Sequence, residues 1–358
     1  MKKFFIFLAT MMLFLGVLAG CTQGNTSSSN SNSNTDDNKP SDEKVDDGAP
    51  KKHAFIFKNT GNPYGEKMMQ GFEEAINELD GEAILRAPDQ PTAEAQIQII
   101  EQLITQKVDS ITLAGNDPDA LQPALKKAMD LGIKVISTDS AVNAKSRMTH
   151  VNQADPEAIG RIQIEAISEM IGGKGQIAIL SATSQATNQN LWIEYMQKEL
   201  EKDTYKDIEL VKVAYGDDLR DKSVSETEAL LKTYPDLKGI IAPTTVGIAA
   251  AGKVLTDKGL AGKVMLTGLG LPSEMASYIE NGVCPWMYLW NPIDVGYAAG
   301  YSAVALVNGD IEGKVGDTFE AGRTGEKSVV EDGDGTQIML GEPFKFDKDN
   351  IAEWKEVY

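Results

Sequence analysis

Cysteine and histidine are almost absent from this chain: its 358 residues include two of each, Cys21, Cys284, His53 and His150. So few side chains cannot build the cysteine and histidine clusters that hold zinc, and no G-x-S-x-G nucleophile motif or cysteine–histidine pairing is present. Both histidines fall in apolar runs with β-strand character, where a structural role is favoured over general-base duty. The sequence therefore predicts neither hydrolytic nor zinc chemistry, and we expect no enzyme.

The chain also has no surplus of positive charge. Its 34 Lys and Arg stand against 53 Asp and Glu, and the net charge of −19 argues against a nucleic-acid partner. The run Gly247–Lys253 has P-loop spacing, but Val254 replaces the Ser or Thr that would hold magnesium, and its interior favours a helix. An EF-hand-like start at 308–313 ends in Phe319 instead of glutamate. We therefore expect no metal and no cofactor.

The first 50 residues have the features of an export signal and a tether. Two lysines precede an apolar run (4–18), two small residues and Cys21, an order that resembles a bacterial lipoprotein signal over 1–20. That resemblance implies a lipid on Cys21. Residues 21–50 are predicted to be a disordered tether because they are polar, small or acidic. A lipidated Cys21 leaves Cys284 without a disulfide partner, so we expect a buried thiol there.

From His53 onward, short β-rich runs alternate with amphipathic helical runs. Asp117 with Pro118 predicts a helix start, and Gly132 predicts the end of the same helix. Repeated β-α units favour parallel sheets covered by helices, and so many strands favour two α/β lobes over one sheet. The expected strands are 53–59, 82–88, 110–116, 134–140, 148–153, 175–181, 208–216, 238–243, 263–270 and 284–291.

Polar side chains gather where these expected strands end. In open parallel sheets the ligand lies beyond the carboxyl ends of the strands, so these positions predict a binding site. Carboxylates and amides suit the paired hydroxyls of a sugar, and aromatic rings suit its C–H faces. The polar candidates are Asp139, Asn188, Gln189 and Asn291, and the aromatic candidates are Tyr64, Trp192 and Trp290.

Over residues 53–358 the chain resembles the type I periplasmic binding proteins, and within them the branch of rhamnose-binding and autoinducer-2-binding proteins of ABC transporters. The resemblance implies two Rossmann-like lobes with parallel sheets, joined by a three-strand hinge. The expected N-terminal lobe is 53–152 plus 292–314, and the expected C-terminal lobe is 153–291 plus 315–358, including a tail on the hinge side. The matching segments are KN (58–59), GNPY (61–64), AGNDPDALQPALKKAM (114–129), STDS (137–140), ILSATSQATNQNLW (179–192), YPDLKGIIAPTTVGIAAAGKV (234–254), TGLGLPSEM (267–275) and LWNPIDVGY (289–297).

The same resemblance implies a ligand clamped between the lobes. The ligand can be either a rhamnose-like sugar or autoinducer-2. The match to the autoinducer-2 binders lies at Lys58, Asp139, Gln189 and Pro243. The match to the rhamnose type lies in the amides at positions 188 and 291. The expected ligand-binding residues are Lys58, Tyr64, Asp139, Asn188, Gln189, Pro243, Thr245 and Asn291.

The family also implies partners and a location. We expect a monomer that delivers a sugar or autoinducer-2 to an ABC transporter permease. It would be extracytoplasmic and held to the outer face of the cytoplasmic membrane by its lipid anchor alone. Sugar-responsive repressors share the fold but begin with a helix-turn-helix, whereas this chain begins with an export signal.

Overall fold

The computed structural model describes residues 49–358. The predicted export signal (1–20), the lipidated Cys21 and nearly all of the tether (21–50) therefore lie outside the described residues. None of the helices in the described part of the chain combines the length and the apolar character needed to cross a bilayer.

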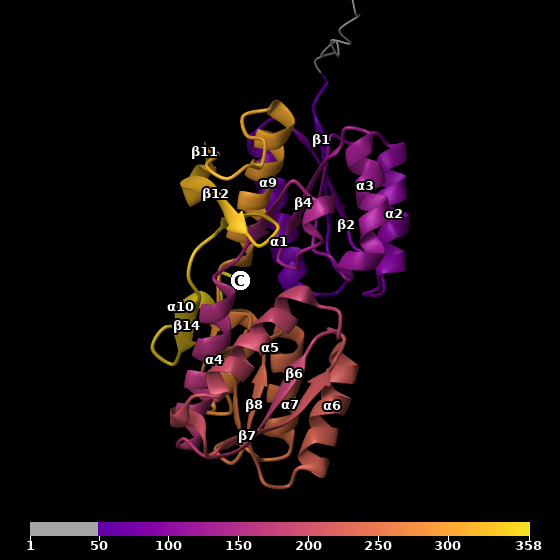
Figure 1. Cartoon of the computed structure of the whole chain (residues 1–358). Coiled ribbons are helices and arrows are strands. Elements are labelled where there is room, and N and C mark those ends of the chain that lie inside the picture. Colours follow the sequence, from indigo (N-terminus) through magenta and orange to yellow (C-terminus); the bar gives the residue numbers. More distant parts are fainter. Residues whose placement is uncertain (1–48) are drawn as a thin grey trace, which may run out of the picture. The chain divides into compact units, whose positions relative to one another are not determined.

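The first lobe is built on a sheet whose five N-terminal strands are parallel (Figure 1). Helices α2 and α3 pack on one face and helices α1 and α9 on the other, so strand β1 is buried on both sides. The strands are β1 (Lys52–Ile56), β2 (Glu82–Arg86), β3 (Ser110–Leu113), β4 (Lys134–Thr138) and β5 (Thr149–Asn152). The helices are α1 (Pro63–Glu78), α2 (Ala93–Thr105), α3 (Pro118–Asp130) and α9 (Pro292–Asn308), with the short 3-10 helices η1 (Ala144–Ser146) and η3 (Gly322–Thr324).

The second lobe has a parallel sheet in the order β7-β6-β8-β9, extended by a bridge between Leu269 and Tyr288 to an antiparallel pair, β10 and β14. Its strands are β6 (Gly175–Ser181), β7 (Ile208–Tyr215), β8 (Leu237–Ala242), β9 (Met265–Gly268), β10 (Trp286–Leu289) and β14 (Phe344–Asp347). Its helices are α4 (Pro156–Ile171), α5 (Thr187–Leu200), η2 (Asp203–Tyr205), α6 (Arg220–Thr233), α7 (Thr245–Asp257), α8 (Pro272–Glu280) and α10 (Ile351–Trp354).

One segment of the expected C-terminal lobe belongs to the first lobe instead. The expected C-terminal lobe includes all of residues 315–358, but strands β11 (Thr318–Glu320), β12 (Glu326–Asp332) and β13 (Gly335–Met339) extend the first sheet. Strand β13 runs parallel to β5, and Arg147 of the first lobe pairs with Asp332 at 2.7 Å. The addition covers what would otherwise be an exposed strand edge at β5. The chain thus passes between the lobes after β5, after β10 and after β13.

The sequence signals for local structure are otherwise confirmed. Every expected β-run contains a strand, and Asp117 caps α3 by accepting the N–H groups of Asp119 and Ala120. The P-loop-like run lies inside the buried helix α7. Cys284 is fully buried, and burial raises the pKa of its thiol, so it is a structural residue.

Candidate functional site

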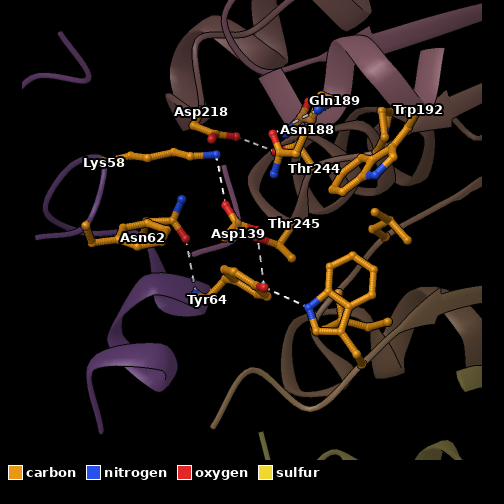
Figure 2. A pocket seen from close by; sticks show the side chains of 15 residues that line it. Lys58, Asn62, Tyr64, Asp139, Asn188, Gln189, Trp192, Asp218, Thr244 and Thr245 are labelled. Atoms are coloured by element: carbon orange, nitrogen blue, oxygen red, sulfur yellow. Dashed lines mark hydrogen bonds and ion pairs between the residues drawn. The ribbon is translucent and has the colours of Figure 1, made fainter. Parts of the chain in front are cut away.

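A cavity lies between the two lobes, at the carboxyl ends of their parallel strands (Figure 2). Residues that directly follow β1, β4, β8, β9 and β10 reach it, together with the turn after β7 and the first residues of helices α1, α5 and α7. Its lining residues are Phe57, Lys58, Asn62, Tyr64, Asp139, Asn188, Gln189, Trp192, Asp218, Pro243, Thr244, Thr245, Leu269, Leu289 and Trp290.

The first lobe contributes a buried ion pair. The Lys58 ammonium lies 3.1 Å from Oδ2 of Asp139, and both side chains are less than a tenth exposed. The Tyr64 hydroxyl donates to the other carboxylate oxygen at 3.4 Å, and the Trp290 indole N–H donates to that hydroxyl at 2.7 Å (Figure 2). Burial raises the pKa of Tyr64, which keeps its hydroxyl protonated as a donor. The Asp139 carboxylate is therefore held in place by polar contacts to Lys58 and Tyr64, and through Tyr64 to Trp290, which lies at a crossing between the lobes.

The second lobe contributes two amides whose orientation follows from backbone donors. Oε1 of Gln189 accepts the N–H of Ala182 at 2.8 Å and the hydroxyl of Ser181 at 2.7 Å. Oδ1 of Asn188 accepts the N–H of Gln189 at 2.8 Å. Because a backbone N–H can only donate, each amide must present its NH₂ group to the remaining space. The cavity is thus supplied with hydrogen-bond donors from α5.

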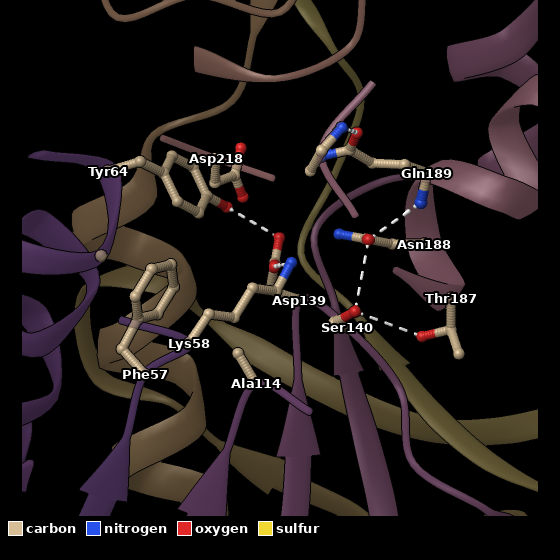
Figure 3. A network of polar contacts seen from close by, with 12 residues as sticks. Phe57, Lys58, Tyr64, Ala114, Asp139, Ser140, Thr187, Asn188, Gln189 and Asp218 are labelled. Atoms are coloured by element: carbon tan, nitrogen blue, oxygen red, sulfur yellow. Dashed lines mark hydrogen bonds and ion pairs between the residues drawn. The ribbon is translucent and has the colours of Figure 1, made fainter. Parts of the chain in front are cut away.

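A polar contact joins the lobes beside the cavity (Figure 3). The Ser140 hydroxyl lies 3.2 Å from that of Thr187 and 3.3 Å from Oδ1 of Asn188, and Thr187 donates to the carbonyl of Ala141 at 2.9 Å. Ser140 follows the end of β4, whereas Thr187 begins α5. Ser140, next to Asp139, and Thr187, next to Asn188, therefore link the two lobes beside the cavity.

Aromatic rings form the apolar side of the cavity. The ring of Trp290 lies 5.9 Å from that of Trp192 and 6.5 Å from that of Tyr64, both in edge-on arrangements. Leu269 and Leu289 complete this side. Such a wall matches the C–H surface of a small polar ligand.

The structure places seven of the eight expected residues on the cavity: Lys58, Tyr64, Asp139, Asn188, Gln189, Pro243 and Thr245. Asn291 is not among the lining residues. Its Oδ1 accepts the N–H of Ile293 at 3.0 Å, capping helix α9, and its Nδ2 donates to Asp294 at 2.9 Å. Asn291 thus stabilises the start of α9.

The expected ligand-binding residues do not include Asp218, Thr244 and Asn62, which also line the cavity. Asn62 caps helix α1 by accepting the N–H groups of Tyr64 and Gly65, and Thr244 caps α7. Asp218 lies in an acidic turn after β7, which reads as a solvated surface turn, yet it is only 9% exposed. Its position on the cavity depends on tertiary structure, and no local signal in the sequence distinguishes it.

The His, Cys, Asp and Glu side chains of residues 49–358 form no metal-binding cluster. No group of three or more His, Cys, Asp or Glu in this range has an arrangement that could hold a metal ion. His53 contacts Ser110 at 2.8 Å and His150 contacts Ser137 at 2.9 Å. Burial lowers the pKa of His53 to about 4 and that of His150 well below its ordinary value, so both rings are neutral structural groups.

Comparisons with known proteins agree with this architecture. The family model described as "Periplasmic binding protein domain" matches residues 53–311. The crystal structure of an ABC transporter solute-binding protein from Clostridium phytofermentas with bound L-rhamnose is 47% identical, with a TM-score of 0.85, and the match covers 87% of this chain and 99% of that one. LsrB from Clostridium saccharobutylicum, in complex with AI-2, has a TM-score of 0.80 at 23% identity, covering 85% of this chain and 99% of that one, which shows a shared fold.

A curated relative matches over a shorter stretch. The D-ribose/D-allose-binding protein of Pseudomonas aeruginosa is 26% identical over 199 residues, which cover 54% of this chain and 61% of that protein. The chain thus spans about three fifths of that relative in the alignment. Because the family model covers most of the described residues and the fold has two lobes with three crossings, the chain belongs to the periplasmic binding protein family.

Proposed function

We propose that this chain is the solute-binding component of an ABC transporter and that it captures L-rhamnose, or a closely related neutral sugar, in the cavity between its lobes. The observation that carries the proposal is the arrangement of the cavity: carboxylates, amide donors and an aromatic wall face one another. The 47% identity to a protein with bound L-rhamnose supports L-rhamnose or a related sugar as the ligand. In this proposal the chain binds its ligand and does not transform it.

The chemistry of a 6-deoxy sugar fits these groups. Each hydroxyl both donates and accepts, so one edge of the ring can donate to Asp139 while another accepts from Asn188 and Gln189. The methyl group and the C–H face have an apolar surface that packs against Trp192 and Trp290. A ligand in this position would contact both lobes, as the two-lobe arrangement requires.

Autoinducer-2 is the second candidate. Lys58, Asp139, Gln189 and Pro243 match the autoinducer-2 binders, and all four line the cavity. Position 291 distinguishes the two ligands less than the sequence suggests. Its amide caps helix α9 and donates to Asp294, so contacts within the protein account for an amide there. Position 188 remains the informative difference, because its NH₂ is presented as a donor.

The family works outside the cytoplasm, and we infer the same for this chain. We further infer that Cys21 carries a lipid, that residues 21–50 tether the body to the outer face of the cytoplasmic membrane, and that a monomer delivers ligand to a permease. The export-type N-terminus supports the lipid and the tether, and the family supports delivery to a permease.

A thermal-shift screen of the full chain tests the proposal. The panel is L-rhamnose, other deoxysugars, ribose, glucose and autoinducer-2. A ligand at 100 times its dissociation constant stabilises the folded state by about 2.7 kcal/mol, which gives a clear rise in Tm. A rise with L-rhamnose supports the proposal. A rise with autoinducer-2 alone would contradict it and assign the chain to signal capture, and glucose serves as the ordinary-hexose control.

A further inference from the structure

Asp218 is a second carboxylate on the cavity and comes from the opposite lobe to Asp139. It lies in the turn between β7 and α6, is only 9% exposed, and faces the Lys58 ammonium (Figures 2 and 3). Lys58 is the only cationic side chain among the lining residues, so one cation serves two buried carboxylates.

The two carboxylates differ in their hydrogen bonding. Asp139 has both oxygens engaged, one with Lys58 and one with Tyr64. Asp218 accepts the Thr244 hydroxyl on Oδ1 alone, and among residues 49–358 no group donates to its Oδ2. Asp218 lines the cavity, and its Oδ2 is not among the fully buried side-chain atoms without a partner, so this oxygen is free to accept a hydrogen bond from a molecule in the cavity.

The charge around Asp218 agrees with this reading. The pKa of Asp218 is raised, because burial outweighs the positive charge of Lys58 and the Thr244 hydrogen bond, which lower it. The carboxylate is thus held beside a shared cation, and a further donor would stabilise its ionised form. Within the cavity, that donor can come from a bound ligand.

We propose that Asp218 determines ligand specificity: its Oδ2 accepts a hydrogen bond from one hydroxyl of the bound sugar, so that a carboxylate from each lobe holds the ligand. This inference rests on the proposed function of the cavity as a neutral-sugar site. It adds a stereochemical requirement, because a sugar that lacks this hydroxyl leaves the carboxylate without its donor.

The backbone supplies a matched control. Asp217 and Asp218 both have left-handed backbones, with φ of 54° and 53°, a conformation that asparagine tolerates well. Asp217 pairs with Lys222 and does not line the cavity. Asp218→Asn and Asp217→Asn therefore make the same chemical change on neighbouring residues, one on the cavity and one off it.

Calorimetric titration of the full chain with L-rhamnose tests the inference. We expect Asp218→Asn to raise Kd by about 10-fold or more, and Asp217→Asn to leave it within about twofold. The same titrations with 1,5-anhydro-L-rhamnitol and with 2-, 3- and 4-deoxy-L-rhamnose, which each lack one of the four hydroxyls, identify the hydroxyl. The penalty of Asp218→Asn should vanish for one analogue and persist for the others.

Two results would overturn the inference. Equal Kd values for the two variants would show that Asp218 does not contact ligand, and an equal penalty for all analogues would show that it acts only through the fold. Failure of the proposed ligand has a different signature, since the unsubstituted chain would not bind L-rhamnose. In that case Asp218→Asn and Asp217→Asn are compared with the neutral sugar that does bind. If the chain binds no neutral sugar, the proposed function and the inference about Asp218 are both refuted.

Discussion

At the scale of single residues, the site depends on a few side chains fixed by contacts with their own lobe. Asp139 has a left-handed backbone, with φ of 59°, at the end of β4, and this conformation directs its carboxylate to Lys58 and Tyr64. The amides of Asn188 and Gln189 are oriented by backbone N–H groups. A ligand therefore meets preorganised groups, which limits the entropy lost on binding.

Substitution of Asp139 tests this arrangement most directly. Asparagine keeps the size and tolerates the left-handed backbone, so Asp139→Asn removes the charge with little strain. We expect Kd for L-rhamnose to rise by about 100-fold, because charge-assisted hydrogen bonds to the ligand are lost. Circular dichroism and calorimetric titration of the same sample separate binding from folding.

The control for this variant is Asp80→Asn. Asp80 has the same left-handed backbone, with φ of 57°, but is exposed at the end of α1. Its substitution should leave Kd unchanged. Tight binding by the Asp139 variant would refute the assigned role of this carboxylate.

Sequence could predict most site residues because they follow strands, where parallel sheets place their ligands. It could not predict Asp218, whose acidic turn resembles a surface loop until the fold brings it to Lys58. Nor could it show that Asn291 turns to Asp294 and the start of α9. In both cases the deciding contact joins side chains whose relative positions only the folded structure reveals.

At the scale of elements, the buried parallel strands were predictable and the late antiparallel ones were not. The expected strands through β10 are apolar runs bounded by helices, a strong β-α pattern. Strands β11 to β13 carry many charges, and of β12 only Val329 is buried, so the segment reads as polar loop. Its place in the first sheet follows from the free edge of β5, a tertiary requirement.

Helices α1 and α9 cross at unusually close range through two glycines. A Cβ on Gly296 would lie 1.8 Å from the Met68 carbonyl oxygen, and one on Gly71 would lie 1.8 Å from that of Ile293. Helix α1 carries Tyr64 at its start, so this crossing also positions the cavity. The contact therefore links packing of the first lobe to the site.

We expect Gly296→Ala to destabilise the protein by about 1–3 kcal/mol, because the helices must move apart. Thermal unfolding measures the loss, and L-rhamnose titration should show weakened binding as Tyr64 shifts. Gly341→Ala is the matched control, since no atom lies within 4 Å of its Cβ position and its backbone is not left-handed. Equal Tm values for the two variants would mean that the crossing tolerates a methyl group.

At the scale of the whole molecule, the binding groups come from two lobes that the chain joins by three crossings. Trp290 lies next to one crossing and donates to Tyr64 of the first lobe, so the crossings take part in the site. A ligand that contacts both lobes should favour the arrangement that brings them together. Binding and lobe arrangement are therefore coupled.

The last prediction concerns the body without its N-terminal segment. Residues Gly48–Tyr358 form one compact unit, and central strand β1 begins at Lys52. We expect removal of residues 1–47 to leave the Tm and the L-rhamnose shift unchanged, because this unit contains every lining residue of the cavity. Removal of residues 1–56 should abolish cooperative unfolding, since β2 and β3 lose the strand between them. Circular dichroism melts with and without sugar measure both deletions, and loss of cooperative unfolding after the shorter one would show that the tether stabilises the body.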